Sequence, residues 1–352
     1  MAAAQERASE PSDIDLLIER AYSQPTTTEA GRGWSLAIDN DLFAPTQTDR
    51  DYTGGFAVTV SGLQTADYWW SLDPVLRSID KVVVADAARR QLPVEHSVQA
   101  GLITFTPQDL LARGINTTDR PYANLLFATA ARQYLAPDGR SVRHSDFTLG
   151  VLGLPVVSDL HNAVHRAVGS PTAHGYAHQI SAGGEPTMRY VTGGSQLRGQ
   201  RLALGSRTLE SKTTWELSAG YLTEVSYAVS TRLGKINSPW WTFNPERVDY
   251  IAQPSPIAPR QRGASRELFV WAGVKARLRA YNAFLQGQFR DSDHRFGASE
   301  LNHAIGELWL GITASSGGTQ MSYAVRYQTA EIREGLGSRD PVWAGFTISH
   351  SF

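Results

Sequence analysis

Three separated stretches of the chain carry oxygen and imidazole side chains that could hydrolyse an ester. Asn40 and Asp41 are adjacent, Thr53 follows in a stretch rich in Asp and Thr, and His165 lies much further along. Carboxylate, amide and hydroxyl oxygens are the ligands that calcium prefers in proteins. A neutral histidine beside such an ion could remove a proton from water, and the resulting hydroxide would attack the ester carbonyl.

Each of these residues also has an interpretation without chemistry. Asp and Asn near strand ends are commonly turn residues, so Asn40 and Asp41 could simply shape a turn. His161 and His165 have the i, i+4 spacing of a zinc-binding pair, but no Glu follows His161 as in H-E-x-x-H, which disfavours zinc. No Ser lies in a G-x-S-x-G motif, so a nucleophile of the α/β-hydrolase type is not supported.

The composition narrows the class of protein further. The 352 residues include no Cys, which excludes disulfides, thiolate zinc sites and a cysteine nucleophile. A net charge of −1 offers no general attraction to nucleic acid, so we expect no nucleic-acid partner. No run approaches the roughly 18 apolar residues that a membrane-spanning helix needs.

Apolar and polar residues alternate along most of the chain, and the last strand ends on the aromatic residue Phe352. This pattern predicts an all-β fold, a transmembrane up-and-down antiparallel β-barrel of about 12 strands of roughly 9 to 14 residues each. The clearer strands are expected at 52–62, 147–153, 225–233, 268–279, 307–313, 321–328 and 341–352. Weaker ones are expected at 34–40, 97–105, 122–134, 185–204 and 213–222.

A barrel in lipid must close, because an unpaired strand edge would leave backbone groups without water. Its inward face may then be polar. We expect the inward charges Lys275, Arg277 and Arg279 to pair in the lumen with acids such as Glu216 and Glu307 rather than to bind phosphates.

Two segments lie outside the strand pattern. Residues 1–33 are predicted to be an N-terminal extension with a short helix over 12–24 and a linker, while 34–352 form the barrel. Met1 to Pro11 lack the apolar core of a secretory signal, so we expect that the signal was removed. Ser158 is predicted to cap a short helix that ends before Gly169.

The order of strands predicts where the candidate residues meet. If the first strand starts in the periplasm, its end at Asn40 and Asp41 and the start of the next strand at Thr53 reach the extracellular rim. The helix with His165 follows the fifth strand at the same rim. Sequence-distant polar segments should therefore converge there.

The candidate residues lie within longer motifs. The first joins N-D-x-F to T-D-R-x-Y-T-x-G, the second joins Y-T-P to D-R-P-Y-A-G, and the third joins H-x-x-x-G to G-W-x-x-Q. The stretches that match are 39–43, 48–55, 105–107, 119–124, 165–169 and 175–179. With these motifs the chain resembles the outer-membrane lipid A 3′-O-deacylases of the LpxR type, from about Trp34 to Phe352.

Three positions depart from the family pattern. Phe105, Asn124 and Tyr176 stand where Tyr, Gly and Trp are usual. Asn162 precedes His165 in this chain, whereas the family often has a Gln within about one residue of that position. The basic residues that contact lipopolysaccharide in the family have no clear match here.

The resemblance implies a twelve-stranded barrel in the bacterial outer membrane, with an active site between the outer-leaflet end of the wall and a short helix at the extracellular rim. It implies Ca2+-dependent hydrolysis of the 3′-position acyl esters of lipid A, by chemistry similar to that of secreted phospholipase A2. His165 matches the general base, Asn40 and Asp41 the active-site pair, and Thr53 the hydroxyl. We assign Asp41 to calcium, and Asn40 and Thr53 to positioning and carbonyl polarisation.

The expected partners are lipopolysaccharide as substrate and the outer-membrane lipids, with the protein a monomer. Two alternatives stay open. In one, a non-enzymatic outer-membrane barrel acts as a pore or adhesin, and the motif residues only hold rim turns. In the other, the chain is a soluble β-sandwich that binds calcium.

Overall fold

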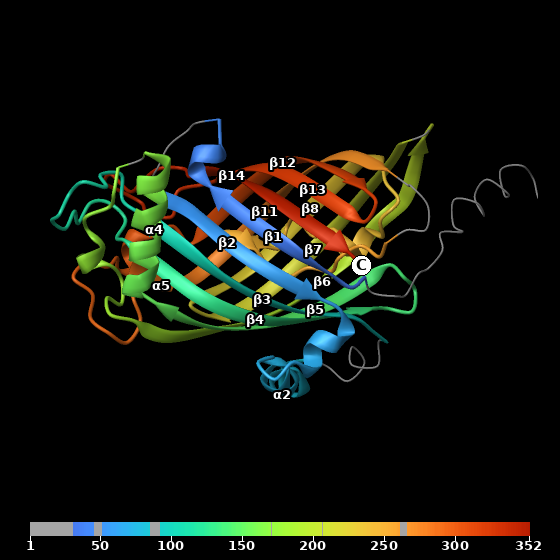
Figure 1. The fold of residues 1–352 in the computed structure, drawn as a ribbon, viewed down its shortest axis with the longest axis horizontal. Helices are drawn as coiled ribbons and strands as arrows, with labels where there is room; N and C mark the ends of the chain where they lie inside the picture. The colour runs from blue at the N-terminus through green and yellow to red at the C-terminus, as the bar shows by residue number, and fades with distance from the viewer. Residues whose placement is uncertain (1–30, 46–50, 85–91, 170, 206, 261–265) are drawn as a thin grey trace, which may run out of the picture.

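A computed structural model describes residues 31–45, 51–84, 92–169, 171–205, 207–260 and 266–352, and within these it contains a closed antiparallel barrel of twelve strands (Figure 1). The twelve are β1 (Gly33–Asn40), β2 (Asp51–Ser61), β3 (Leu92–Thr106), β4 (Ala123–Leu135), β5 (Ser141–Leu152), β6 (Glu185–Leu204), β7 (Arg207–Gly220), β8 (Leu222–Lys235), β11 (Glu267–Asn282), β12 (Ala304–Ser316), β13 (Thr319–Gln328) and β14 (Val342–Ser351).

The barrel closes between its first and last strands. β1 pairs with β2 on one side and with β14 on the other, from Gly33 opposite Ser351 to Asn40 opposite Ala344. Each remaining barrel strand pairs with the barrel strands before and after it in sequence, so the barrel of the described residues has no open strand edge. The alternative of a soluble β-sandwich is therefore wrong, and the predicted barrel is confirmed.

All twelve predicted strands are confirmed, although their lengths vary more than expected, from 8 residues in β1 to 20 in β6. The outer face of the wall is apolar, because every second side chain of the strands points outward. On β8, β11 and β12 the exposed large apolar side chains are Val225, Tyr227, Val229, Leu268, Val270, Val274, Leu278, Leu308, Leu310 and Ile312.

A polar network fills the lumen, as predicted. The ammonium of Lys275 lies 3.0 Å from the carboxylate of Glu216, and the guanidinium of Arg277 pairs with Glu307. Arg279 pairs with Glu224 at 2.6 Å. These side chains are buried, so each charge depends on a partner within the barrel.

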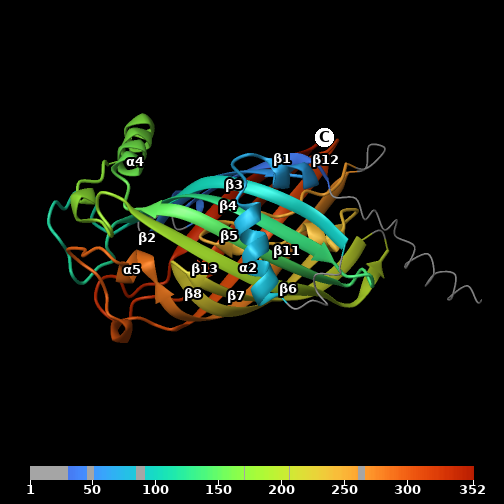
Figure 2. The same cartoon turned by 90° about the horizontal axis from the view of Figure 1, so that it is seen from below.

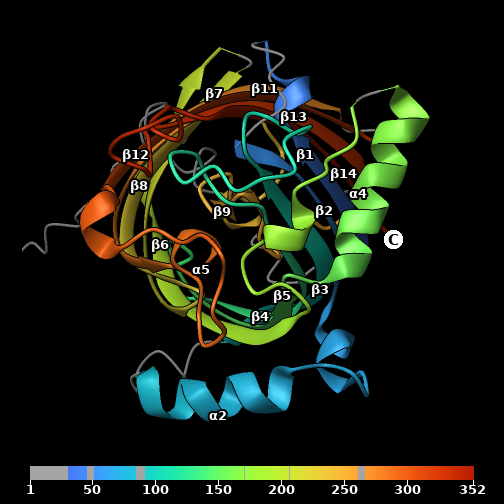
Figure 3. The ribbon, with the colours of Figure 1, turned by 90° about the vertical axis from the view of Figure 1, so that its left-hand side faces the viewer.

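The segment between β8 and β11 lies inside the barrel, where Figure 3 shows it within the ring of strands. The sequence patterns did not predict this lumen insert, residues 236–260, which contains η4 (Trp240–Thr242), β9 (Val248–Asp249) and β10 (Ile251–Ala252). Its Arg247 bonds to Asp146 of β5 at 2.5 Å, and its Asp249 pairs with Arg189 of β6 at 2.6 Å. The insert is thus tied to the wall by charge.

Short helices lie at the barrel ends and outside the wall: η1 (Asp41–Phe43), η2 (Leu63–Asp67), α2 (Asp73–Val83), α4 (Pro155–Val168), η3 (Tyr176–His178), α5 (Ala283–Gln286) and η5 (Ala298–Glu300). Among the described residues, no helix has the length and apolar character that crossing a membrane requires. The helix predicted over 12–24 lies outside the described residues.

The predicted rim helix exists, but its start differs from the prediction. α4 begins at Pro155 with Leu154 as its N-cap, and Ser158 lies buried within it. Proline suits the first helical position because its missing N–H has no partner there in any helix. The predicted end is confirmed, since Gly169 caps the helix in the left-handed region at φ 75°.

The lumen network predicts a strong stability effect at Arg247. Arg247→Ala leaves the buried carboxylate of Asp146 without its cation, which should lower the free energy of unfolding by about 3–5 kcal/mol. Urea unfolding in detergent, followed by the loss of the barrel's heat-modifiable gel mobility, measures this. Arg207→Ala, at an exposed position of β7, should change little; equal midpoints for the two variants would contradict the prediction.

Candidate active site

The end of β1 and the start of β2 are joined by the side chain of Asn40. Its amide nitrogen donates to the carbonyl of Thr53 at 2.6 Å, and its amide oxygen accepts from the backbone N–H of Leu42 at 2.7 Å. Asn40 therefore caps η1 and fixes two strand ends at once. Asn40 therefore does shape the turn after β1, as the interpretation without chemistry predicts.

Thr53 occupies a β-bulge. The register of β2 on β3 passes from Tyr52 to Gly54 and leaves Thr53 as the extra residue. Bulges re-aim side chains, and here the Thr53 hydroxyl lies buried 2.5 Å from that of Thr106. Gly54 is required beside it, because a Cβ there would lie 2.8 Å from the carbonyl oxygen of Asp39.

Asp41 begins η1, and the residue is only 1% exposed. The short helix is held against the outer face of the wall. The ring of Phe43 lies 5.6 Å from that of Phe346 on β14, and the Tyr323 hydroxyl of β13 donates to the Phe43 carbonyl at 2.9 Å. These contacts hold the buried carboxylate of Asp41 at the rim where β1 pairs with β14.

His165 lies buried on α4 in a defined tautomer. Its Nδ1 is 2.6 Å from the carbonyl oxygen of Pro171, and a carbonyl can only accept. In the neutral ring, Nδ1 therefore carries the proton and Nε2 carries the lone pair. This is the arrangement that a histidine general base requires.

Two further side chains fasten α4 to the segment that follows it. The amide of Asn162 both donates to the Ala173 carbonyl, at 3.0 Å, and accepts from the Ala173 N–H, at 2.7 Å. Nδ1 of His161 is 3.1 Å from the Tyr176 hydroxyl, and the Tyr176 ring lies 4.6 Å from that of Tyr122. The helix is thereby linked to the chain that enters β4.

The rings of His161 and His165 lie 4.0 Å apart. Burial and the neighbouring His165 lower the pKa of His161 to about 3. His161 is therefore neutral near pH 7, and it places no positive charge beside His165. The sequence patterns did not predict that His161 is a neutral neighbour of His165, although the i, i+4 spacing places the two side chains side by side.

The opposite face of α4 is apolar and exposed. Val156, Leu160 and Val164 repeat every fourth residue on that face. Figures 1 and 3 show α4 outside the wall at one end of the barrel, on the side where β1, β2 and β14 lie. At this rim the helix presents hydrocarbon outward and two histidines inward.

The second motif holds the rim loops together. Arg339, in the connection between β13 and β14, donates to Asp51 from Nε and to Asp119 from Nη2, both at 2.8 Å. The buried Arg120 lies over the Phe105 ring, 4.5 Å from its centroid. Arg339 was missed because no pattern around it differs from that of an ordinary loop arginine.

The structure thus brings Asn40 and Thr53 into direct contact, places Asp41 in the next turn, and carries His165 to the same rim on a separate helix. The predicted convergence at one end of the barrel is confirmed. Among the described residues, no three or more His, Cys, Asp or Glu side chains form a group that could hold a metal ion.

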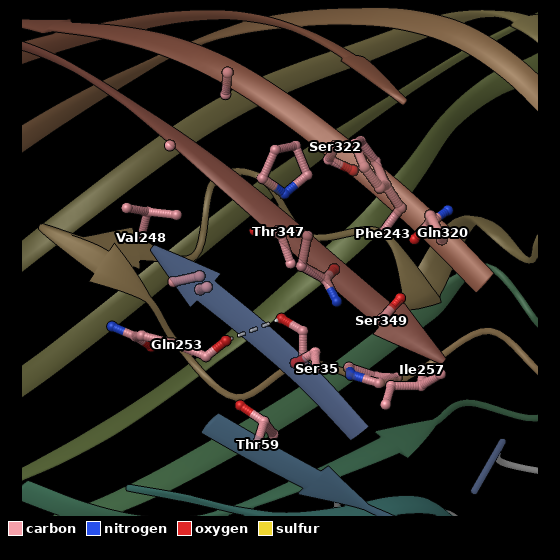
Figure 4. A pocket seen from close by; sticks show the side chains of 18 of the residues that line it. Ser35, Thr59, Phe243, Val248, Gln253, Ile257, Gln320, Ser322, Thr347 and Ser349 are labelled. Carbon is pink, nitrogen blue, oxygen red and sulfur yellow. Dashed lines mark hydrogen bonds between the residues drawn. The ribbon is translucent and has the colours of Figure 1, made fainter. Parts of the chain in front are cut away.

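A separate cavity of about 130 Å³ lies in the lumen between the wall and the insert (Figure 4). Its lining includes Ser35 of β1, Thr59 of β2 and Gln253 of the insert, and it contains none of the four predicted site residues. The candidate site is therefore a feature of the rim and not of the lumen.

The closed wall with its apolar outer face and charged lumen defines the class: this is an integral outer-membrane β-barrel with a polar site at one rim. The family model described as outer membrane protein LpxR matches residues 12–352, so the chain belongs to the LpxR family of outer-membrane proteins. The match begins earlier than the resemblance we drew from Trp34. Membership implies lipid A deacylase activity.

A solved structure shares this fold. LpxR from Salmonella typhimurium is 16% identical, has a TM-score of 0.69, and covers 91% of this chain and 100% of its own. The β domain of the Bordetella autotransporter BrkA is 10% identical with a TM-score of 0.43, over 92% of this chain and 100% of its own. No curated protein matches the chain.

The low pKa of His161 predicts an acid-sensitive helix. When α4 is detached from the wall, His161 is exposed and has the ordinary histidine pKa near 6.5, whereas in the packed helix its pKa is about 3. Between these two values the detached state binds a proton that the packed state does not bind. The packing of α4 therefore weakens as the pH falls below 6.5. Hydrogen exchange of the α4 amides, corrected for intrinsic rate, should therefore accelerate from pH 7 to pH 4.5. His161→Gln should flatten this dependence, whereas His174→Gln, at an exposed position of the same rim, should not. An unchanged slope in His161→Gln would refute the assignment.

Proposed function

We propose that this protein hydrolyses the acyl esters at the 3′ position of lipid A in the outer leaflet, with His165 as general base and with calcium. The observation that carries the proposal is the buried His165, whose tautomer is fixed by the Pro171 carbonyl, on a helix with an apolar outward face. Such a helix meets acyl chains on one side and presents a base on the other.

The proton path follows from the His165 tautomer. Nε2 accepts a proton from water, and the hydroxide attacks the ester carbonyl carbon. The imidazolium that forms is stabilised at Nδ1 by the Pro171 carbonyl, at 2.6 Å. Nε2 then returns the proton to the sugar oxygen as the C–O bond breaks, which releases a carboxylic acid and a hydroxyl.

The residues at the rim fit a calcium ion with few charged ligands. Asp41 supplies a buried carboxylate, and the neighbouring Asn40 and Thr53 supply neutral hard oxygens. When bound there, calcium would polarise the ester carbonyl. A site with one carboxylate binds weakly, on the order of 10⁻⁴–10⁻³ M, in the range of extracellular modules.

Asn40 and Thr53 position this site as well as contribute oxygens. The amide of Asn40 holds η1, which begins with Asp41, and the bulge directs Thr53 toward Thr106. We assign to both residues the placement of the ester carbonyl and its polarisation. In this assignment the turn and the chemistry use the same side chains.

The alternative is a barrel without enzymatic activity. The lumen insert disfavours a passive pore, because its Arg247 and Asp249 bond across the channel to the wall. The fold and the exposed rim loops would suit an adhesin equally well. An adhesin, however, would have no use for a buried histidine with a fixed tautomer. It predicts no release of acyl groups.

The deacylase proposal is tested by mass spectrometry of lipid A from cells that export the protein. The wild type should remove the 3′-linked acyl group, and His165→Ala should be slower by about 10²–10⁴-fold, the usual contribution of a general base. His174→Ala, a histidine at an exposed position of the same rim, should keep the wild-type rate. Unaltered lipid A with a folded wild-type barrel would favour the adhesin.

The calcium assignment predicts a shift in metal dependence. Purified wild-type enzyme should lose activity in chelator and regain it at free calcium of about 10⁻⁴–10⁻³ M. Asp41→Asn removes the charge with little change in shape, so its half-saturating calcium should rise about tenfold or more. Full activity in excess chelator would exclude the metal, and an unshifted Asp41→Asn would exclude this ligand.

A further inference from the structure

We propose that α2 and the turn before it form a docking surface for phospholipids of the periplasmic leaflet. The surface, the α2 patch, consists of Trp69, Trp70 and the exposed sides of the helix over Asp73–Val83. This inference rests on the outer-membrane barrel and not on the proposed ester chemistry. It concerns the leaflet opposite the candidate active site.

The helix belongs to the connection between β2 and β3, at the end of the barrel opposite α4. Figure 2 shows it lying across the strands, and Figure 3 shows it outside the ring beside β4 and β5. A helix that runs across the strands outside a membrane barrel lies in the plane of the membrane. Helices in this position bind lipid when one side is apolar and the other is charged.

Polar contacts fix α2 to the wall. Asp73 bonds to Arg132 of β4 at 2.5 Å and lies 3.1 Å from His96 of β3. Asp80, two turns on, accepts from Ser145 of β5 and Tyr190 of β6, both at 2.8 Å. With both ends of the helix attached, its rotation about its own axis is fixed.

Strand register shows which side of the helix faces the bilayer centre. Leu76 packs on Ala130 and Phe147, a pair directly opposite each other on β4 and β5. Asp73 and Asp80 contact Arg132 and Ser145, the pair two residues nearer the periplasmic end. The Leu76 side of the helix is therefore the side toward the membrane core.

The residues beyond Leu76 on that side are apolar. Leu72 and Ile79 pack against the same cluster, and at about 100° per residue Val75 and Val82 continue the side outward. Val82 is 86% exposed. On the opposite side, Arg77 and Lys81 continue from Asp73 and Asp80 and point toward the periplasm. The charge is thus on the side where headgroups lie.

The exposed apolar face of the wall is shorter beside α2 than it is on β11. On β11 exposed apolar side chains run from Leu268 to Leu278, almost the whole strand. On β5 the last exposed apolar residue toward the periplasm is Leu149, and Ser145 lies under the helix. The helix covers Phe147, the next outward apolar residue of β5, so the apolar side of α2 takes the place of the wall at that level.

Two aromatic residues strengthen this placement. Trp69 is 95% exposed, and Trp70 lies beside Tyr68 with ring centroids 5.7 Å apart. Tryptophan is favoured at the membrane interface, where it has both apolar and polar neighbours. A phospholipid therefore fits each part of the patch: acyl chains at Val75 and Val82, the interface at the tryptophans, and phosphate at Arg77 and Lys81.

The depth of the patch can be measured directly, because the chain has no native cysteine. The full-length protein in phosphatidylethanolamine and phosphatidylglycerol nanodiscs would carry an environment-sensitive fluorophore at Val82→Cys or Lys81→Cys. The Val82 label should be quenched by spin labels on the acyl chain, and the Lys81 label by spin labels on the headgroup. Pro137→Cys, in the exposed turn between β4 and β5, reports periplasmic water.

The proposal is overturned if iodide in solution quenches the Val82 label as fully as the Pro137 label while acyl-chain spin labels do not. Val75→Cys provides a second probe of the same side if Val82→Cys does not form the heat-modifiable barrel. Helix exposure to water would then assign the patch to a soluble periplasmic partner instead.

Headgroup recognition has its own test. Arg77→Gln with Lys81→Gln should weaken binding of phosphatidylglycerol, titrated into the detergent-solubilised protein and counted by native mass spectrometry, by about 30-fold for two cationic side chains. Arg207→Gln with Lys235→Gln removes the same charge at exposed positions of β7 and β8 and should leave binding unchanged. Equal affinities in the two double variants would refute the headgroup site.

Discussion

Every backbone group of the wall must find its partner within the wall, because lipid offers none. The pairing of β1 with β14 satisfies this demand, and the rest of the molecule follows from it. A closed wall sends polar side chains inward, where Lys275 and Glu216 meet, and apolar ones outward, as at Leu310. Where the pairing ends, at the rim, polar side chains can meet the lipid.

The candidate site lies at such an ending. Asn40 is the last residue of β1, and Thr53 is the residue that the β2–β3 register leaves out. The irregular backbone here releases the carbonyl and the hydroxyl of Thr53 from the regular strand pairing. Neither group is left unsatisfied, because the carbonyl accepts a hydrogen bond from the Asn40 amide and the hydroxyl bonds to that of Thr106. His165 comes from a helix that lies outside the wall, so the site is assembled from elements that need not fit the sheet.

The sequence predicted the parts of this protein that repeat a simple period. All twelve strands follow from alternation of residues, and the convergence of Asp41, Thr53 and His165 follows from the alternating direction of consecutive strands. The lumen insert was not predictable, because Arg247 and Asp249 acquire their meaning only from Asp146 and Arg189 on distant strands. The start of α4 was misplaced for a local reason: Ser158 resembles a cap, but Pro155 provides the first turn. Neither the tautomer of His165 nor the contact of Asn40 with Thr53 leaves any trace in residue spacing.

The lumen insert has a consequence for the order in which the barrel assembles. Its contacts join residues of moderate sequence separation, such as Glu246 with Lys212 of β7 and the Pro245 carbonyl with Arg326 of β13. The seam instead joins Gly33 to Ser351. Loop closure costs more entropy for the longer separation. Charged side chains of β5 to β13 can thus be neutralised by the insert while the sheet is still an open ribbon. Closure of the barrel then requires only the backbone hydrogen bonds between β1 and β14. The terminal strands would pair last, around a lumen whose charges already have partners.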